Sequence, residues 1–202
     1  MRGGWWVTCL ILLAGMARPA HGQKLPALPG SRITDSGVVR AGAAIDSVFV
    51  LRTRSADTVD IGDFAAQLIA RIGAPPFGDS LAFRVTSDTA LIRVAGRLTD
   101  FPPDVRADLR PLFAFIDSNS VFVADISMPQ HSGGVMRFHL DRVTVRGLTI
   151  PDLLLIPALQ QYTLLYPTLL ASGGREFLVA MPTDGSARLV RNGIELTLPR
   201  QP

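Results

Sequence analysis

Three pairs of short segments in this sequence alternate apolar and polar residues, and turn-forming residues separate the two members of each pair. The pairs cover 81–98, 120–146 and 187–198. A period of two places alternate side chains on opposite faces of a strand, so each pair predicts an antiparallel hairpin with one buried face. The turn at Asn192-Gly193 is the strongest of these hairpin signals. Three hairpins with few β-α-β units favour an antiparallel sheet over a doubly wound one.

In the second strand of the second hairpin, the apolar residues switch from even-numbered to odd-numbered positions. Apolar residues occupy alternate, even-numbered positions over 136–140 and odd-numbered positions over 143–145. Without an inserted residue, such a shift would turn part of the buried set to the wrong face of the sheet. The sequence therefore predicts a β-bulge at Asp141-Arg142.

Three further segments have the composition and spacing of helices. Residues 60–73 place apolar side chains at i, i+3, i+4 and i+7, with Asp60 as an N-cap and Gly73 as a stop. Residues 102–116 begin with two prolines and contain a third that should bend the helix. Residues 148–170 are mostly apolar and carry no charge other than Asp152, but prolines and Gln160-Gln161 interrupt them, which favours a helix along the inside of a sheet over a membrane span.

The order of these elements predicts an α+β fold in which a long curved antiparallel sheet is wrapped around apolar helices. Residues 46–52 alternate weakly and are predicted as a first strand. Residues 23–44 are rich in Pro, Gly and Ser without a sustained period, and we expect a flexible arm there. Residues 45–202 then form a single domain, which is an ordinary size for one hydrophobic core.

The first 22 residues have the layout of a secretory signal peptide. Arg2 precedes an apolar stretch over 5–15, and small residues surround the exit at 20–22. The apolar stretch is shorter than the roughly 20 residues that a membrane span needs. We therefore expect cleavage before Gln23 and a protein that works in the periplasm or is secreted. Because the single cysteine, Cys9, lies in this segment, the mature chain has no thiol for disulfides, catalysis or metal binding.

The charge distribution argues against nucleic acid as a partner. The formal net charge is +3, and removal of Arg2 and Arg18 leaves 18 basic residues against 17 acidic ones. Basic and acidic residues are interspersed, so the chain lacks the basic run or stripe that a nucleic-acid interface requires.

Candidates for catalysis are few. His131 lies in a turn, and Ser186 lacks the Gly-x-Ser-x-Gly frame of a nucleophile elbow. His139 and Asp141, with Arg137 beside them, offer fewer than the three or four ligands of a usable metal site, which favours a charge ladder on the outer face of the sheet. We predict no enzyme activity, no metal and no cofactor. An envelope hydrolase stays an open alternative if carboxylates or His139 gather in a cleft.

The remaining feature is a surplus of apolar surface. Residues 112–116 and 153–170 are apolar around the whole helix, and one face of a small sheet has to cover both. Either these segments close a core, or they leave an apolar groove that an acyl chain fills. The first case predicts a non-catalytic envelope scaffold or interaction protein. The second predicts a lipid-binding protein that contacts the envelope membrane peripherally, with a groove lined by Phe113, Phe115, Phe138, Leu154 and Tyr162.

Three segments carry a resemblance to a known family. These are 63–69, the strand 92–97, and 138–151, in which a long strand ends in Gly-Leu-Thr-Ile-Pro before an apolar segment. Over residues 59–198 the chain resembles small exported bacterial members of the tubular lipid-binding superfamily, including the LmeA-like proteins. The resemblance implies a long twisted sheet wrapped on a helix, with acyl chains between them and no fixed catalytic residues. Pro157 and the arm over 23–44 depart from that pattern.

Overall fold

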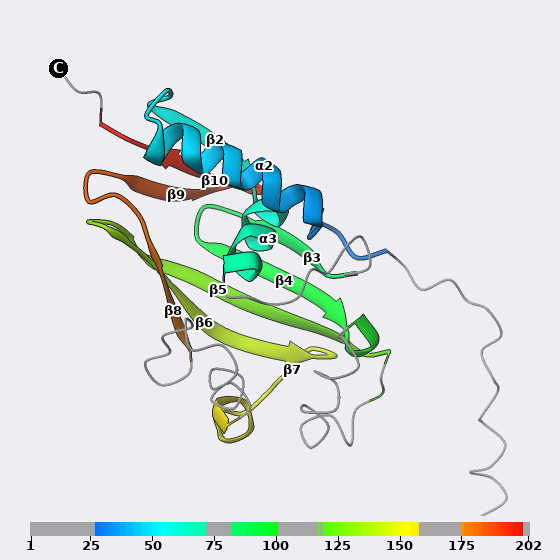
Figure 1. The fold of residues 1–202 in the computed structure, drawn as a ribbon. Helices are drawn as coiled ribbons and strands as arrows, with labels where there is room; N and C mark the ends of the chain where they lie inside the picture. Colours follow the sequence, from blue (N-terminus) through cyan, green and yellow to red (C-terminus); the bar gives the residue numbers. More distant parts are fainter. Residues whose placement is uncertain (1–26, 72–81, 101–116, 118, 158–174, 200–202) are drawn as a thin grey trace, which may run out of the picture.

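An open, curved antiparallel sheet with helices on one face forms the body of the molecule (Figure 1). The structure is a computed structural model that describes residues 27–71, 82–100, 117, 119–157 and 175–199. Its strands are β1 (Ser31–Arg32), β2 (Ala56–Asp60), β3 (Arg84–Ser87), β4 (Leu91–Arg97), β5 (Val121–Ser132), β6 (Val135–Val145), β7 (Leu148–Thr149), β8 (Glu176–Ala180), β9 (Ser186–Val190) and β10 (Gly193–Thr197). The helices are α2 (Asp35–Ile45), which continues into a π-helical turn over Asp46–Val50, and α3 (Ile61–Arg71), with a 3-10 turn over Leu98–Asp100. Residues 152–157 are also helical.

The strand order confirms the predicted α+β class with an antiparallel sheet. Strands run in the order β1-β3-β4-β5-β9-β10-β2, and β6 pairs with β5, β7 and β8. Every pairing is antiparallel. Strands β5 and β6 are the longest and form the hairpin that runs across the lower part of the view (Figure 1).

The three predicted hairpins are confirmed as β3–β4, β5–β6 and β9–β10. In the last one, the predicted turn residues have different roles. Asn192 adopts the left-handed conformation, with φ of 56°, whereas Gly193 is already the first residue of β10 and pairs with Val190. A Cβ at Gly193 would lie 2.9 Å from the carbonyl oxygen of Val59, so the glycine is needed for the close approach of β2.

The predicted bulge is also confirmed. Asp125 pairs with Arg142, and the next residue, Ile126, pairs with Leu140. Asp141 is therefore the extra residue on β6, and the inward-facing apolar set keeps its face on both sides of it. A second register shift follows between Ser127 and Gln130. Bulges increase local twist, which agrees with the curvature of this hairpin.

Helix α3 is the predicted helix over 60–73, and the structure describes it from Ile61 to Arg71. Its start is fixed by the expected cap. The carboxylate Oδ1 of Asp60 accepts hydrogen bonds from the N–H groups of Gly62 at 2.8 Å and Asp63 at 3.2 Å.

Two predictions for the amino-terminal part are wrong. Residues 35–44, expected to belong to a flexible arm, form most of α2, and Ala41 is completely buried. The helix starts because Thr34 Oγ1 accepts from the N–H of Gly37 at 3.1 Å, and its small residues allow close packing on α3, so the packed part of the chain begins before residue 45. Residues 46–52, expected as a strand, begin with the π-helical turn that extends α2, in which Val48 and Phe49 are buried.

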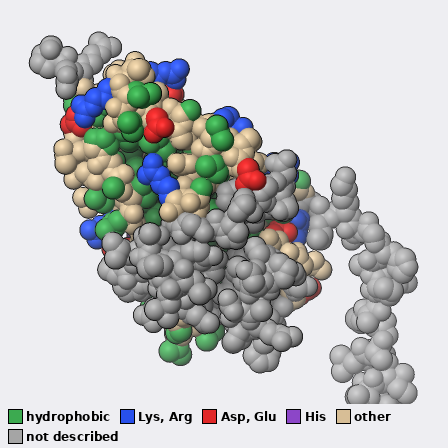
Figure 2. Space-filling model, viewed as in Figure 1, with side chains coloured by type: hydrophobic (Ala, Val, Ile, Leu, Met, Phe, Trp, Pro, Cys, Tyr) green, Lys and Arg blue, Asp and Glu red, His purple; other side chains and the backbone are tan. Residues whose placement is uncertain are grey.

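Several predictions lie outside the described residues. They include the signal peptide over 1–22, the bent helix over 102–116 and the part of the last predicted helix beyond residue 157. The described start of that helix, 152–157, protrudes at the lower end of the view, where Figure 2 shows hydrophobic side chains on the surface. Leu148 and Leu153, from β7 and this helix, are 75% and 84% exposed.

Ser87, at the end of β3, links this strand to the β9–β10 hairpin. Its Oγ donates to the carbonyl oxygen of Val190 at 2.7 Å and accepts from the N–H of Gly193 at 2.8 Å. The N–H of Asn192 donates to the carbonyl oxygen of Ser87 at 2.9 Å. Ser87 is buried, so these bonds are shielded from water, and they join parts of the chain more than 100 residues apart.

We expect Ser87→Ala to lower the free energy of unfolding by about 1–3 kcal/mol, because it leaves the buried N–H of Gly193 without its acceptor. Urea denaturation of the variant and the parent measures the change. Ser55→Ala, at an exposed position, is the matched control and should change stability by less than about 0.5 kcal/mol. Equal stability of the two variants would contradict a structural role for the Ser87 hydroxyl.

Candidate functional site

An apolar cavity of about 440 Å³ lies between helix α3 and the inner face of the sheet. Helix α3 forms one wall through its apolar stripe, and strands β3, β4, β5 and β6 form the opposite wall. Strand β8 closes one side through residues 177–180. Ligand sites in proteins have volumes of roughly 300–1,000 Å³ and mostly apolar walls, so this cavity has the size and chemistry of a binding site.

The helical wall follows from the period of α3. Phe64, Ala65, Leu68 and Ile69 line the cavity at the spacing of one helix face. The opposite side of the helix carries Asp63, which faces α2. There Arg40 binds both carboxylate oxygens of Asp63, with Nε to Oδ2 at 2.7 Å and Nη2 to Oδ1 at 2.6 Å. The ion pair and the stripe together fix which face of α3 turns toward the sheet.

The sheet wall follows from strand alternation. Its lining residues are Val85 from β3, Ile92 and Val94 from β4, Phe122 and Ile126 from β5, and Phe138 from β6. Within each strand these residues are two or four positions apart, as expected for side chains on one face.

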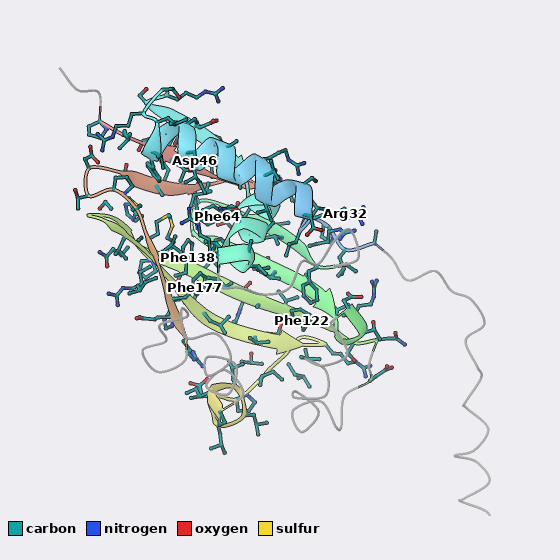
Figure 3. The ribbon with its side chains drawn as sticks, viewed as in Figure 1. Arg32, Asp46, Phe64, Phe122, Phe138 and Phe177 are labelled. Carbon is teal, nitrogen blue, oxygen red and sulfur yellow. The ribbon has the colours of Figure 1, made fainter. Side chains whose placement is uncertain are left out.

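Three aromatic rings form the contact that joins the two walls (Figure 3). The ring centroids of Phe64 on α3 and Phe138 on β6 are 6.0 Å apart, and both residues are almost completely buried. Phe138 stacks on Phe177 of β8 with centroids 4.8 Å apart, and the two are directly paired across the strands. Aromatic pairs of this kind add about 0.5–1.5 kcal/mol beyond the area that they bury.

A second aromatic pair lines another part of the cavity. The rings of Phe83 and Phe122 meet edge to face with centroids 5.5 Å apart. A Cβ at Gly96 of β4 would lie 2.4 Å from Phe83 Cδ1 and 2.8 Å from Phe122 Cε1. The absence of a side chain at Gly96 therefore provides the space that this ring pair occupies.

A smaller cavity of about 140 Å³ lies beside the first, near the carboxyl end of α3. Phe64, Leu68, Arg71, Val179 and Ala180 line both cavities. Among the described residues around the larger cavity, Arg71 is the only charged one. The junction of the two cavities thus combines apolar walls with one cation.

The predicted lining residues have different outcomes. Phe138 lines the cavity, as proposed from the sequence. Leu154 is 51% exposed and is not among the lining residues. Phe113, Phe115 and Tyr162 lie outside the described residues.

Sequence reasoning missed the contribution of α3 and β8 to the cavity. The stripe of α3 was visible as a helical period, but a period does not distinguish a helix packed on a closed core from one beside a cavity. Strand β8 was not predicted, because its residues 176–180 do not alternate clearly between apolar and polar.

A group of titratable residues from strands β4, β5, β6 and β8 lies on the outer face of the sheet. Asp125, next to the inward-facing Ile126, accepts hydrogen bonds from Arg93 Nε at 2.8 Å and Arg142 Nε at 2.7 Å. Arg137 donates to Glu176 at 3.0 Å, and His139 Nδ1 lies 3.7 Å from the other carboxylate oxygen of Glu176. Asp141 accepts a hydrogen bond from Ser127 Oγ at 2.9 Å. These contacts agree with the charge ladder expected for Arg137, His139 and Asp141.

The described residues lack the features of two other kinds of site. Within these ranges, His, Asp and Glu side chains do not form a group of three that could hold a metal ion. None of the helices in the described part of the chain has the length and apolar character needed to cross a membrane.

Comparison with known proteins gives no guide to function, so the cavity is the main one. The chain matches no protein-family model, no curated protein and no solved structure.

The Asp125 cluster predicts a specific dependence of stability on pH. Burial raises the pKa of Asp125, but hydrogen bonds and positive charge from Arg93 and Arg142 outweigh it, so the pKa lies below its usual 3.8. A carboxylate with a lowered pKa in the folded state stabilises the fold above its unfolded-state pKa, and this stabilisation is lost as the pH falls through the folded-state value.

We therefore expect Asp125→Asn to lower the free energy of unfolding by about 1–3 kcal/mol at pH 7. The difference from the parent should persist to about pH 5 and shrink below about pH 4. Urea denaturation at several pH values measures it. Asp184→Asn removes the exposed pair with Arg52 and should cost less than about 1 kcal/mol. A difference for Asp125→Asn that does not vary with pH would contradict the assignment.

Proposed function

We propose that this protein binds a lipid or another apolar ligand in the cavity between α3 and the sheet, and that it acts in the periplasm or after secretion. The observation that carries the proposal is the cavity itself, whose described walls are apolar apart from Arg71. Burial of apolar surface stabilises by about 25 cal/mol per Å², so an acyl chain gains free energy from such walls without specific polar contacts.

Two further observations support a binding role at the envelope. The antiparallel sheet with α3 against it agrees with the fold implied by the resemblance to tubular lipid-binding proteins, in which the sheet wraps around apolar helices. The exposed Leu148 and Leu153 support peripheral contact with a membrane, because exposed leucines insert readily at an apolar interface. We propose binding without catalysis, since the carboxylates of Asp125 and Glu176 pair with arginines on the outer face of the sheet, away from the cavity.

The first test is native mass spectrometry of the protein purified from its own envelope fraction. Lipid bound at near-stoichiometric amounts supports the proposal and identifies the ligand. An unliganded mass that does not change after incubation with envelope lipids supports the closed-core scaffold instead. The same mass reports whether the chain begins at Gln23.

The second test fills the cavity. Ala65 lines it from α3, so we expect Ala65→Phe to weaken binding of the neutral fluorescent probe N-phenyl-1-naphthylamine at least about tenfold, which corresponds to about 1.4 kcal/mol. Ala43→Phe places the same ring at an exposed position of α2 and serves as the matched control. Circular dichroism checks that both variants fold. Equal affinity of the two folded variants for the probe would contradict binding in this cavity.

A further inference from the structure

Arg71 occupies an unusual position for an arginine of this protein. It is the last described residue of α3, it is exposed to solvent, and it lines both the larger and the smaller cavity. The larger cavity therefore reaches the surface beside a guanidinium group. Since the other described lining residues of this cavity are uncharged, Arg71 determines which charge a bound molecule can carry at that end.

Arg71 has no carboxylate partner among the described residues. Most described arginines have one, as Arg40 has in Asp63. Asp63 is the only acidic residue of α3, and Arg40 already binds both of its oxygens. The guanidinium of Arg71 is thus available to an anion from outside the described part of the chain.

The helix alone offers a simpler reason for a cation at this position. A positive charge in the last turn stabilises the negative end of the helix dipole. This effect requires a cation near the carboxyl end of α3, but it does not require that the cation line an apolar cavity. The two explanations make different predictions about ligands, because the dipole effect is independent of what occupies the cavity.

We propose that the cavity binds a single-chain amphiphile with an anionic head group, a carboxylate or a phosphate, and that Arg71 binds this head group where the cavity reaches the surface. The inference rests on the proposed function and adds the class of ligand. The guanidinium suits both head groups, because its planar set of N–H donors matches two oxygens at once. A volume of about 440 Å³ is in the lower part of the range for ligand sites, which favours one chain over several.

The test compares ligands that share a chain and differ in the head group. Dodecanoate, dodecyl phosphate and dodecanol, each below its micelle concentration, compete with N-phenyl-1-naphthylamine on the full chain. The preference for an anion is the inhibition constant of dodecanol divided by that of the anion. We expect this ratio to be about fivefold larger for the parent than for Arg71→Gln, the size expected for a partly exposed ion pair. Raising the salt concentration should reduce this preference.

Two variants separate binding by Arg71 from general effects of charge and folding. Arg71→Lys keeps the charge but lacks the planar fork, so it should retain part of the preference for anions. Arg191→Gln removes an exposed positive charge in the β9–β10 turn and should retain all of it. A parent and an Arg71→Gln variant with the same preference would overturn the inference, as would displacement of the probe by inorganic phosphate alone. A parent that does not bind the probe contradicts the proposed function itself, so the two failures are distinguishable.

Discussion

The contact of Phe64 with Phe138, which in turn stacks on Phe177, fixes the position of α3 against the sheet. It joins the helix to β6 and β8, with Phe64 and Phe138 buried and Phe177 partly buried beside them. Because α3 is held there and also by the Arg40–Asp63 ion pair on its other side, its apolar stripe cannot rotate away from the sheet. The walls of the cavity are therefore a consequence of how this helix is attached.

The curvature of the sheet explains why a cavity remains beside a packed helix. Two register shifts interrupt the long β5–β6 hairpin, and each adds twist to it. Within the described residues, β5 and β9 pair only at Ser132 and Ser186, and Ser87 joins β3 to the β9–β10 hairpin elsewhere. A sheet shaped in this way is concave toward α3, and one short helix contacts only part of that surface.

The two faces of the sheet carry different kinds of side chains. On the outer face, acidic and basic side chains satisfy one another, as Asp125 does with Arg93 and Arg142. The cavity between the inner face and α3 has a described lining that is aliphatic and aromatic apart from Arg71 of α3. This separation favours recognition of a molecule that is itself divided into an apolar chain and a charged group, because each part then meets a matching surface.

Local sequence patterns determined the hairpins, the bulge at Asp141 and helix α3, because the period of apolar residues and the turn and cap residues that decide them are a few positions apart. They also predicted Phe138 as an inward-facing residue. Tertiary structure decided what depends on distant residues: β2 exists because residues 56–60 pair with 193–197, and β8 because it pairs with β6. Tertiary packing also stabilises the helix at 35–45, because its small residues pack closely on α3. Those residues lack the wide apolar stripe by which a sequence reveals a helix. The cavity belongs to this second group, because its volume is set by the distance between α3 and the sheet, which no local pattern encodes.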